Sequence, residues 1–326
     1  MAHTGKDVML AARYLKEDKL VAIPTETVYG LAGNAFSPQA VSSIFAAKNR
    51  PSFNPLITHT YDISRVEAYV QAIPDTARQL SAAFWPGPLT LLLPKNELIP
   101  DIVTTGSDTV AVRIPNHPLT LELLQLLDFP LAAPSANPFG YISPTRAEHV
   151  NEQLGDKIEY ILDGGPCSVG IESTIVGFEG ETLMIYRLGG TSLEDMEAVV
   201  GKNKIRLHDK VVENSNPQAP GMLKSHYAPS KKVIVGDMGK LISRYHSHEI
   251  ALITLKDYYP QVSHERQVAL SVAGDLNEAA QQLFSALRKL DKLPGKYILA
   301  ELMPEYGLGN AINDRLMRAA AEKEED

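Results

Sequence analysis

Short apolar runs alternate with amphipathic segments along most of the chain. Apolar runs bounded by proline, glycine or polar residues predict strands at residues 20–23, 55–58, 89–93, 131–133, 160–162, 174–177 and 183–187. Apolar residues at helical spacing predict helices at residues 7–17, 38–48, 63–70, 74–84, 118–127 and 191–200. Clean alternation over residues 109–114 predicts a further strand, with Arg113 on the face opposite Val112. Such alternation of strands with helices predicts an α/β fold.

Local signals indicate where some of the predicted helices begin and end. Ser143 followed by Pro144 is typical of an N-cap with proline at the first helical position. Thr191 and Glu194 have the spacing of a capping box for the helix that ends at residue 200. Pro51 predicts that the helix over residues 38–48 cannot continue.

The periodic pattern breaks over residues 206–230, where proline, glycine and polar residues leave no sustained period. We therefore expect a first domain over residues 1–205, a linker over 206–230 and a smaller C-terminal domain over 231–326. In the C-terminal domain we expect strands at residues 232–236, 249–255 and 296–300, and helices at 240–246, 276–290 and 310–321. Their alternation predicts a Rossmann-like parallel α/β domain.

Composition narrows the class of protein. A chain of 326 residues favours two domains, and 44% hydrophobic with 21% charged residues is typical of a soluble globular protein. The net charge of -8 argues against broad, nonspecific nucleic-acid binding. Cys167 is the only cysteine, which excludes an intramolecular disulfide and a zinc site built from cysteines. Since the sequence shows neither a secretion signal nor an apolar stretch of membrane-spanning length, we expect a cytoplasmic protein.

The polar residues after the strand predicted at 20–23 are the first candidates for chemistry. They belong to the sequence Pro-Thr-Glu-Thr-Val-Tyr-Gly-Leu over residues 24–31. Ligands collect at strand ends in open α/β sheets. If this stretch is extended, Thr25, Thr27 and Tyr29 share one face and suit a small polar ligand. A polar turn between two strands explains the same residues equally well.

Cationic residues also fall at the ends of predicted elements, namely Lys48, Arg50, Arg113 and Arg187. The planar fork of an arginine fits a carboxylate or a phosphate. Any one of these residues alone is explained by an ion pair at the edge of the sheet. Together they favour a shared anionic ligand, because small polar residues accompany them at Ser135, Asn137 and Ser173. No standard nucleotide motif is present, so the residues alone predict only an α/β domain that binds a small anion.

A family resemblance is carried by residues 24–36 (PTETVYGLAGNAF), 48–51 (KNRP), 54–56 (NPL), 85–90 (WPGPLT), 109–113 (TVAVR), 133–137 (APSAN), 170–174 (GIEST) and 187 (R). In this order the segments resemble those of the YrdC-type threonylcarbamoyl-adenylate synthases. The family's lysine-x-arginine and serine-x-asparagine signatures are present as Lys48/Arg50 and Ser135/Asn137. Residues 219–222 and 226–229 are similar to the two-domain branch of the family. The resemblance implies an N-terminal twisted mixed sheet with flanking helices.

The same resemblance implies a nucleotidyltransferase that joins L-threonine, bicarbonate and ATP into threonylcarbamoyl-adenylate and pyrophosphate. The product would pass to a tRNA threonylcarbamoyl-transferase complex that modifies the adenosine next to the anticodon, and no stable direct tRNA binding is expected. Magnesium would accompany ATP, held largely by phosphate and water, so no protein metal ligand is expected. Catalysis would consist mainly of positioning and charge stabilisation.

Residue roles follow from the resemblance position by position. The threonine-side candidates are Thr27, His59, Arg113, Ser135 and Ser173. The ATP-side candidates are Lys48, Arg50, Asn54, Thr109, Asn137, Ser143, Thr145, Arg187 and Tyr227. The catalytic candidates are Lys48, Arg50 and Arg113. Ser143 is also explained by its expected helix-cap role, and Tyr227 either folds over ATP as a lid or packs between the domains.

Two other functions compete with this one. An RNA-binding or ribosome-maturation factor without turnover could use a cationic concave surface of the same fold, although the acidic net charge speaks against it. A carbamoyl-transfer maturation module would contain a similar domain, but such proteins usually carry cysteine-rich zinc segments, and this chain has one cysteine. Threonine-dependent release of pyrophosphate distinguishes the three.

Overall fold

The computed structural model describes residues 2–208, 219–220, 222 and 226–321. The strands are β1 (His3–Gly5), β2 (Val21–Ile23), β3 (Gly30–Asn34), β4 (Ile57–His59), β5 (Leu89–Pro94), β6 (Thr109–Arg113), β7 (Leu131–Ala132), β8 (Tyr160–Leu162), β9 (Thr174–Glu179), β10 (Thr182–Arg187), β11 (Ile205–Leu207), β12 (Lys232–Val235), β13 (Ile250–Thr254), β14 (Gln267–Ala269) and β15 (Tyr297–Ala300). The helices are α1 (Val8–Lys16), α2 (Pro38–Lys48), α3 (Ile63–Glu67), α4 (Asp75–Phe84), α5 (Asp101–Thr104), α6 (Pro118–Gln125), α7 (Ala147–Leu154), α8 (Leu193–Val200), α9 (Met238–Ile242), α10 (Leu276–Asp291) and α11 (Gly309–Ala320).

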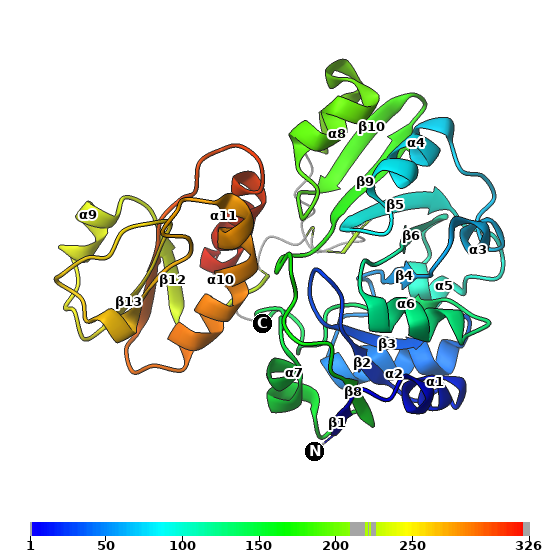
Figure 1. Cartoon of the computed structure of the whole chain (residues 1–326), viewed down its shortest axis with the longest axis horizontal. Coiled ribbons are helices and arrows are strands. Elements are labelled where there is room, and N and C mark those ends of the chain that lie inside the picture. The colour runs from blue at the N-terminus through cyan, green and yellow to red at the C-terminus, as the bar shows by residue number, and fades with distance from the viewer. Residues whose placement is uncertain (1, 209–218, 221, 223–225, 322–326) are drawn as a thin grey trace.

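The described strands form two separate sheets (Figure 1). The larger has the order β1-β8-β2-β3-β7-β4-β6-β5-β9-β10-β11 and mixes parallel pairs, such as β4 with β6, with antiparallel pairs, such as β5 with β6. The smaller has the order β12-β15-β13-β14, and its pairs are all parallel. The expected fold class is therefore confirmed: a mixed N-terminal sheet with helices is followed by a smaller parallel α/β unit.

Helices α1 and α2 show how residues in the sequence determine where a helix begins and ends. α1 begins after Asp7, whose side chain accepts a hydrogen bond from the backbone N–H of Leu10, and it buries the predicted apolar stripe. α2 has the predicted bounds. It ends because Asn49 adopts a left-handed conformation with φ 51°. Asn49 thereby turns the chain, and Arg50 leaves the helix in a new direction.

Two predicted helix caps are wrong. The helix expected at Ser143 begins only at α7, and the Ser143 hydroxyl instead donates a hydrogen bond of 2.5 Å to Oε1 of Glu172. The cap of α8 is Ser192, which accepts from the backbone N–H of Asp195, and not Thr191. At Ser143 a hydrogen bond to a residue distant in sequence replaces the expected cap. At Thr191 the adjacent Ser192 is the cap instead.

Other predicted bounds shift in the described residues. α9 covers Met238–Ile242 in place of residues 240–246, because Asp237 caps it two residues earlier than expected. Four short strands were not predicted, namely β1, β3, β11 and β14. Much of the linker expected over residues 206–230 lies outside the described residues.

Helices α10 and α11 face the N-terminal part of the chain in Figure 1, while α9 lies on the other side of the small sheet. Their apolar residues join one buried cluster with Val28, Ile142 and Ile171 of the N-terminal part. At Gly170 the backbone has φ +78°, and a Cβ atom there would lie 2.4 Å from the Cα atom of Gln281 on α10. Glycine is therefore required where the loop before β9 packs against α10.

Candidate active site

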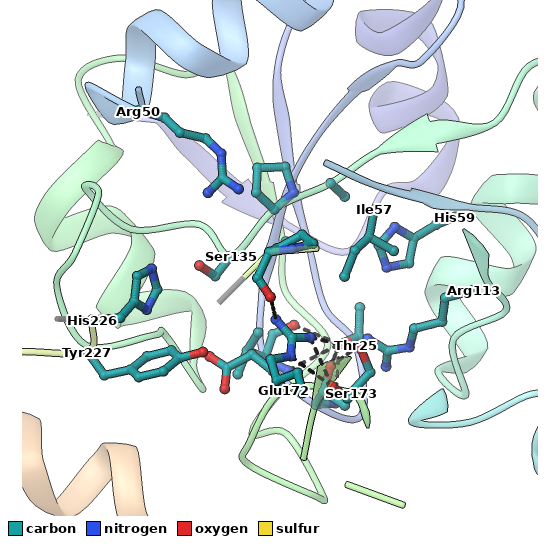
Figure 2. A pocket seen from close by; sticks show the side chains of 17 residues that line it. Thr25, Arg50, Ile57, His59, Arg113, Ser135, Glu172, Ser173, His226 and Tyr227 are labelled. Atoms are coloured by element: carbon teal, nitrogen blue, oxygen red, sulfur yellow. Dashed lines mark hydrogen bonds between the residues drawn. The ribbon is translucent and has the colours of Figure 1, made fainter. Parts of the chain in front are cut away.

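A pocket lies in the N-terminal part of the chain, and Pro220, His226 and Tyr227 complete its lining (Figure 2). Its wall combines the turn after β2, the ends of β4, β6 and β10, the loops after β7 and before β9, and residues 226–227. In Figure 2, Arg50, His226 and Tyr227 lie on one side of the pocket, and His59 and Arg113 lie on the opposite side with Ser135 between them. Segments far apart in sequence thus contribute polar side chains to one site.

Residues 25–28 form a polar turn on the wall. The Thr25 hydroxyl oxygen accepts hydrogen bonds from the backbone N–H groups of Thr27 and Val28, and it lies 2.8 Å from the Thr27 hydroxyl oxygen. The extended conformation that would place Tyr29 beside Thr25 and Thr27 is therefore wrong. Tyr29 is buried in the core, and its hydroxyl donates to the backbone oxygen of Gly165 at 2.7 Å. Thr25 and Thr27 line the pocket.

Arg113 is anchored to this turn. Its Nη1 donates to the Thr27 hydroxyl at 2.8 Å, and its Nε donates to the backbone oxygen of Gly87 at 3.1 Å. Its Nη2 lies 2.8 Å from Oε2 of Glu26, and the two side chains form a buried ion pair that departs from ideal hydrogen-bond angles. Glu26 thus compensates the charge of Arg113 and fixes the guanidinium at the wall.

Three other buried cations at or next to the pocket, Lys48, Arg50 and Arg187, have no carboxylate partner among the described residues. Lys48 Nζ donates to the backbone oxygens of Ser135 and Asn137, each at 2.5 Å. Burial, together with the neighbouring Arg187, lowers the pKa of Arg50 to about 9, and burial lowers the pKa values of Lys48 and Arg187. Because buried charges are normally paired, an anionic ligand would complete this cluster.

The hydrogen bonds of Arg50 and Arg187 hold their guanidinium groups in place. Arg50 donates from Nε and Nη2 to Asn54 and from Nη2 to the backbone oxygen of Pro55. Arg187 donates from Nε and Nη2 to the backbone oxygen of Ser173 and from Nη1 to that of Pro220. Neutral oxygens thus orient both groups, and their positive charges stay available to a ligand.

Two buried histidines complete the polar wall. Burial and the nearby Arg113 lower the pKa of His59 to about 3, so its ring is neutral at physiological pH. Burial and the cations Arg50 and Lys48 likewise lower the pKa of His226. The Nδ1 atoms of His59 and His226 are buried without a hydrogen-bond partner in the described residues. Each of these nitrogen atoms can form a hydrogen bond with a bound molecule.

Comparisons with known proteins identify the relatives of this chain. Residues 13–189 match the Sua5/YciO/YrdC family model, described as telomere recombination, and residues 191–321 match that of the threonylcarbamoyl-AMP synthase C-terminal domain. A threonylcarbamoyl-AMP synthase from Pyrococcus abyssi is 43% identical over 321 residues, which cover 96% of this chain and 94% of the relative. The chain belongs to the threonylcarbamoyl-AMP synthase family.

Other members of the family match nearly the whole length of the chain. The threonylcarbamoyl-AMP synthase of Bacillus subtilis is 40% identical, with 95% of this chain and 92% of the relative covered. The crystal structure of P. abyssi Sua5 complexed with L-threonine has a TM-score of 0.90 and 41% identity, and the match covers 98% of this chain and 97% of that one. The resemblance to YrdC-type synthases is therefore confirmed for both parts of the chain.

For this member of the threonylcarbamoyl-AMP synthase family, the structure places some of the predicted site residues on the pocket wall and others outside it. On the wall lie Thr27, Arg50, His59, Arg113, Ser135, Ser173, Arg187 and Tyr227. Not on the wall are Lys48, Asn54, Thr109, Asn137, Ser143 and Thr145. Several of the second group support the first: Lys48 holds the backbone of Ser135, and Asn54 holds Arg50.

Three polar wall residues received no role from the family resemblance, namely Thr25, Glu172 and His226, although Thr25 was a candidate from the strand-end pattern. All three lie inside segments that carry the family resemblance, so the sequence did contain a signal. In the structure Oε1 of Glu172 accepts from Ser143 and its Oε2 accepts from Arg315 Nε at 3.1 Å.

Proposed function

We propose that this pocket is the active site in which L-threonine, bicarbonate and ATP are joined. As a member of its family, the chain is an ATP-dependent nucleotidyltransferase that makes threonylcarbamoyl-AMP, with release of pyrophosphate, for the threonylcarbamoyl modification of tRNA. The observation that carries the choice of pocket is the group of buried cations without carboxylate partners. A triphosphate supplies the negative charge that they lack.

Arg50 and Arg187 form the ATP side of the proposed site. Both guanidinium groups line the pocket, and Lys48 lies behind Ser135. Among the described residues, Arg50 Nη1 has no hydrogen-bond partner. Repulsion between Arg50 and Arg187 contributes to the lowered pKa of Arg50, and a bound phosphate relieves it. On this side we also assign ATP contacts to Tyr227. Asn54 and Ser143 act through the wall residues Arg50 and Glu172. Thr109, Asn137 and Thr145 stay proposed ATP-side residues.

Arg113 forms the threonine side, with Thr27, His59, Ser135 and Ser173. A guanidinium has five N–H donors, and Arg113 directs Nε, Nη1 and Nη2 each to one protein atom. One N–H of each amino group is left for a carboxylate. The related P. abyssi structure contains L-threonine, which supports an amino-acid site in this fold.

The proposed chemistry needs orientation and charge stabilisation more than a nucleophilic side chain. A carbamate oxygen of carboxylated threonine attacks the α-phosphorus of ATP, and pyrophosphate leaves with the electron pair of the broken P–O bond. Arg50 and Arg187 stabilise the charge on the phosphate oxygens. Neutral His59 orients the threonine part without adding a charge. Tyr227, 1% exposed, covers the pocket and excludes water.

Magnesium is proposed to enter with ATP. The pocket wall offers one carboxylate, Glu172, and both of its oxygens already accept hydrogen bonds. Among the described residues, no group of three acidic, histidine or cysteine side chains could hold a metal ion. These residues fit an ion coordinated by phosphate oxygens and water, which would neutralise triphosphate charge.

The remaining assignments concern the setting of the enzyme. We propose residues 1–205 as the catalytic domain, 206–230 as the linker that carries Tyr227, and 231–326 as the C-terminal domain. We also propose that the product passes to a tRNA threonylcarbamoyl-transferase complex in the cytoplasm, without stable binding of tRNA by this chain. None of the described helices has the length and apolar character of a membrane span.

The test is threonine-dependent release of pyrophosphate. Full-length protein is mixed with ATP, magnesium and bicarbonate, with or without L-threonine, and pyrophosphate and the adenylate product are measured. The proposal requires both to appear only when threonine is present. Absence of both products, with salt-sensitive RNA binding, would support the rival RNA-binding function.

A further inference from the structure

Arg315 on α11 reaches the pocket from the C-terminal part of the chain. Its side chain is fully buried, and its Nε donates to Oε2 of the wall residue Glu172 at 3.1 Å. Its Nη1 donates to the backbone oxygen of Leu188 at 2.6 Å and to Asp314 at 2.9 Å. Its guanidinium carbon lies 5.4 Å from the centre of the Tyr227 ring. A single guanidinium therefore contacts two residues of the wall.

Glu172 is an unusual component of a pocket that takes anions. It is 6% exposed, and its Oε1 is held by the Ser143 hydroxyl, which cannot neutralise its charge. Arg315 is its ion-pair partner among the described residues. Without that partner, a buried carboxylate would face the space that we assign to ATP and would oppose the attraction of Arg50 and Arg187.

We propose that Arg315 is a positioning residue for the reaction, which neutralises Glu172 so that the C-terminal part of the chain completes the ATP side of the pocket. The inference rests on the proposed function of this pocket. It gives α11 a role in ligand binding that is distinct from burial of its apolar face.

The matched control is Arg288 on α10. Arg288 is also buried and also joins the two parts, but it donates to the backbone oxygens of Ile142 and Ser143 and to Gln153. It therefore resembles Arg315 in burial and in bridging, and it has no contact with a carboxylate on the pocket wall. The Arg288 variant therefore measures how ATP binding changes when only the packing between the two parts of the chain is weakened.

The experiment measures the Kd of ATP by titration calorimetry and the KM and kcat of threonine-dependent pyrophosphate release. Arg315→Met should raise the Kd and KM for ATP at least about tenfold, because a unit charge a few ångströms from an anion opposes binding by more than 1.4 kcal/mol at an effective dielectric constant of about 20. Arg288→Met should change them by less than about threefold. Adding Glu172→Gln to Arg315→Met should restore most of the affinity, because it removes the uncompensated charge.

Equal losses in Arg315→Met and Arg288→Met, or no recovery in the double variant, would overturn the inference and leave Arg315 with a packing role. If Arg315→Met does not fold, the double variant is compared with Glu172→Gln alone. The inference then requires Kd values for ATP within about threefold of each other, and a larger difference contradicts it. A wild-type enzyme without threonine-dependent turnover would refute the proposed function, whereas an active wild type with an unaffected Arg315→Met variant would refute this inference alone.

Discussion

Replacing His59 by asparagine should remove one source of instability in mild acid. His59 is 3% exposed, and burial beside Arg113 lowers its pKa to about 3, whereas the unfolded chain has a histidine pKa of about 6.5. As the pH falls below 6.5, the unfolded chain binds a proton that the native protein does not bind. His59 therefore contributes stability that is complete above pH 6.5 and is lost as the pH falls toward 3.

The size of the effect follows from this linkage. Between pH 7.5 and pH 5.0, the proton bound by the unfolded chain alone lowers the unfolding free energy by about 2 kcal/mol. Urea unfolding at these two pH values is measured for the wild type, His59→Asn and His264→Asn, in which an exposed histidine is replaced. The unfolding free energy of the wild type minus that of His59→Asn should fall by about 2 kcal/mol at the lower pH.

The control variant should show the same pH dependence as the wild type. A difference between wild type and His59→Asn that is equal at both pH values would refute the reasoning, because it would mean that His59 binds its proton equally in the native and unfolded states. It would also remove the argument that His59 presents a neutral ring to threonine.

Two further predictions concern residues behind the wall. Lys48→Met should lower the unfolding free energy by about 2 kcal/mol, because the backbone oxygens of Ser135 and Asn137 lose a buried donor. It should also reduce kcat for pyrophosphate release. An unchanged unfolding free energy in urea would contradict this prediction. Gly170→Ala should destabilise the protein by clearly more than Gly165→Ala in the same assay. Both glycines have a positive φ, so alanine at either position costs about 1 kcal/mol of backbone strain. Only at Gly170 would the new Cβ also collide with another residue, on α10. Equal losses of unfolding free energy in the two variants would contradict this prediction.

The sequence predicts best those elements whose pattern is local. The apolar stripe of α1 and the bounds of α2 and β8 are correct because burial and helix-ending signals lie within the segments themselves. β3 was missed because Gly30–Asn34 contains two glycines and lacks β-branched residues, and it is a strand through its pairing with β2 and β7. Its neighbours, and not its own propensity, set its conformation.

The site shows a similar limit. Strand ends and cationic residues in the sequence indicated an anion site, and several of those residues do share one pocket. Sequence spacing could not show that Ser143 donates to Glu172, or that Glu172 pairs with Arg315 from α11, because these contacts span 29 and 143 residues. Nor could it separate Lys48, which supports the wall, from Arg50, which forms it.

The most direct test of the account is a crystal structure of the full-length enzyme with L-threonine and a non-hydrolysable ATP analogue. The account predicts the amino-acid carboxylate at Arg113 and the phosphates at Arg50 and Arg187, with the α-phosphorus facing the threonine nitrogen inside one pocket. A nucleotide bound outside this pocket, or threonine bound away from Arg113, would contradict the central claim that one pocket joins the two substrates.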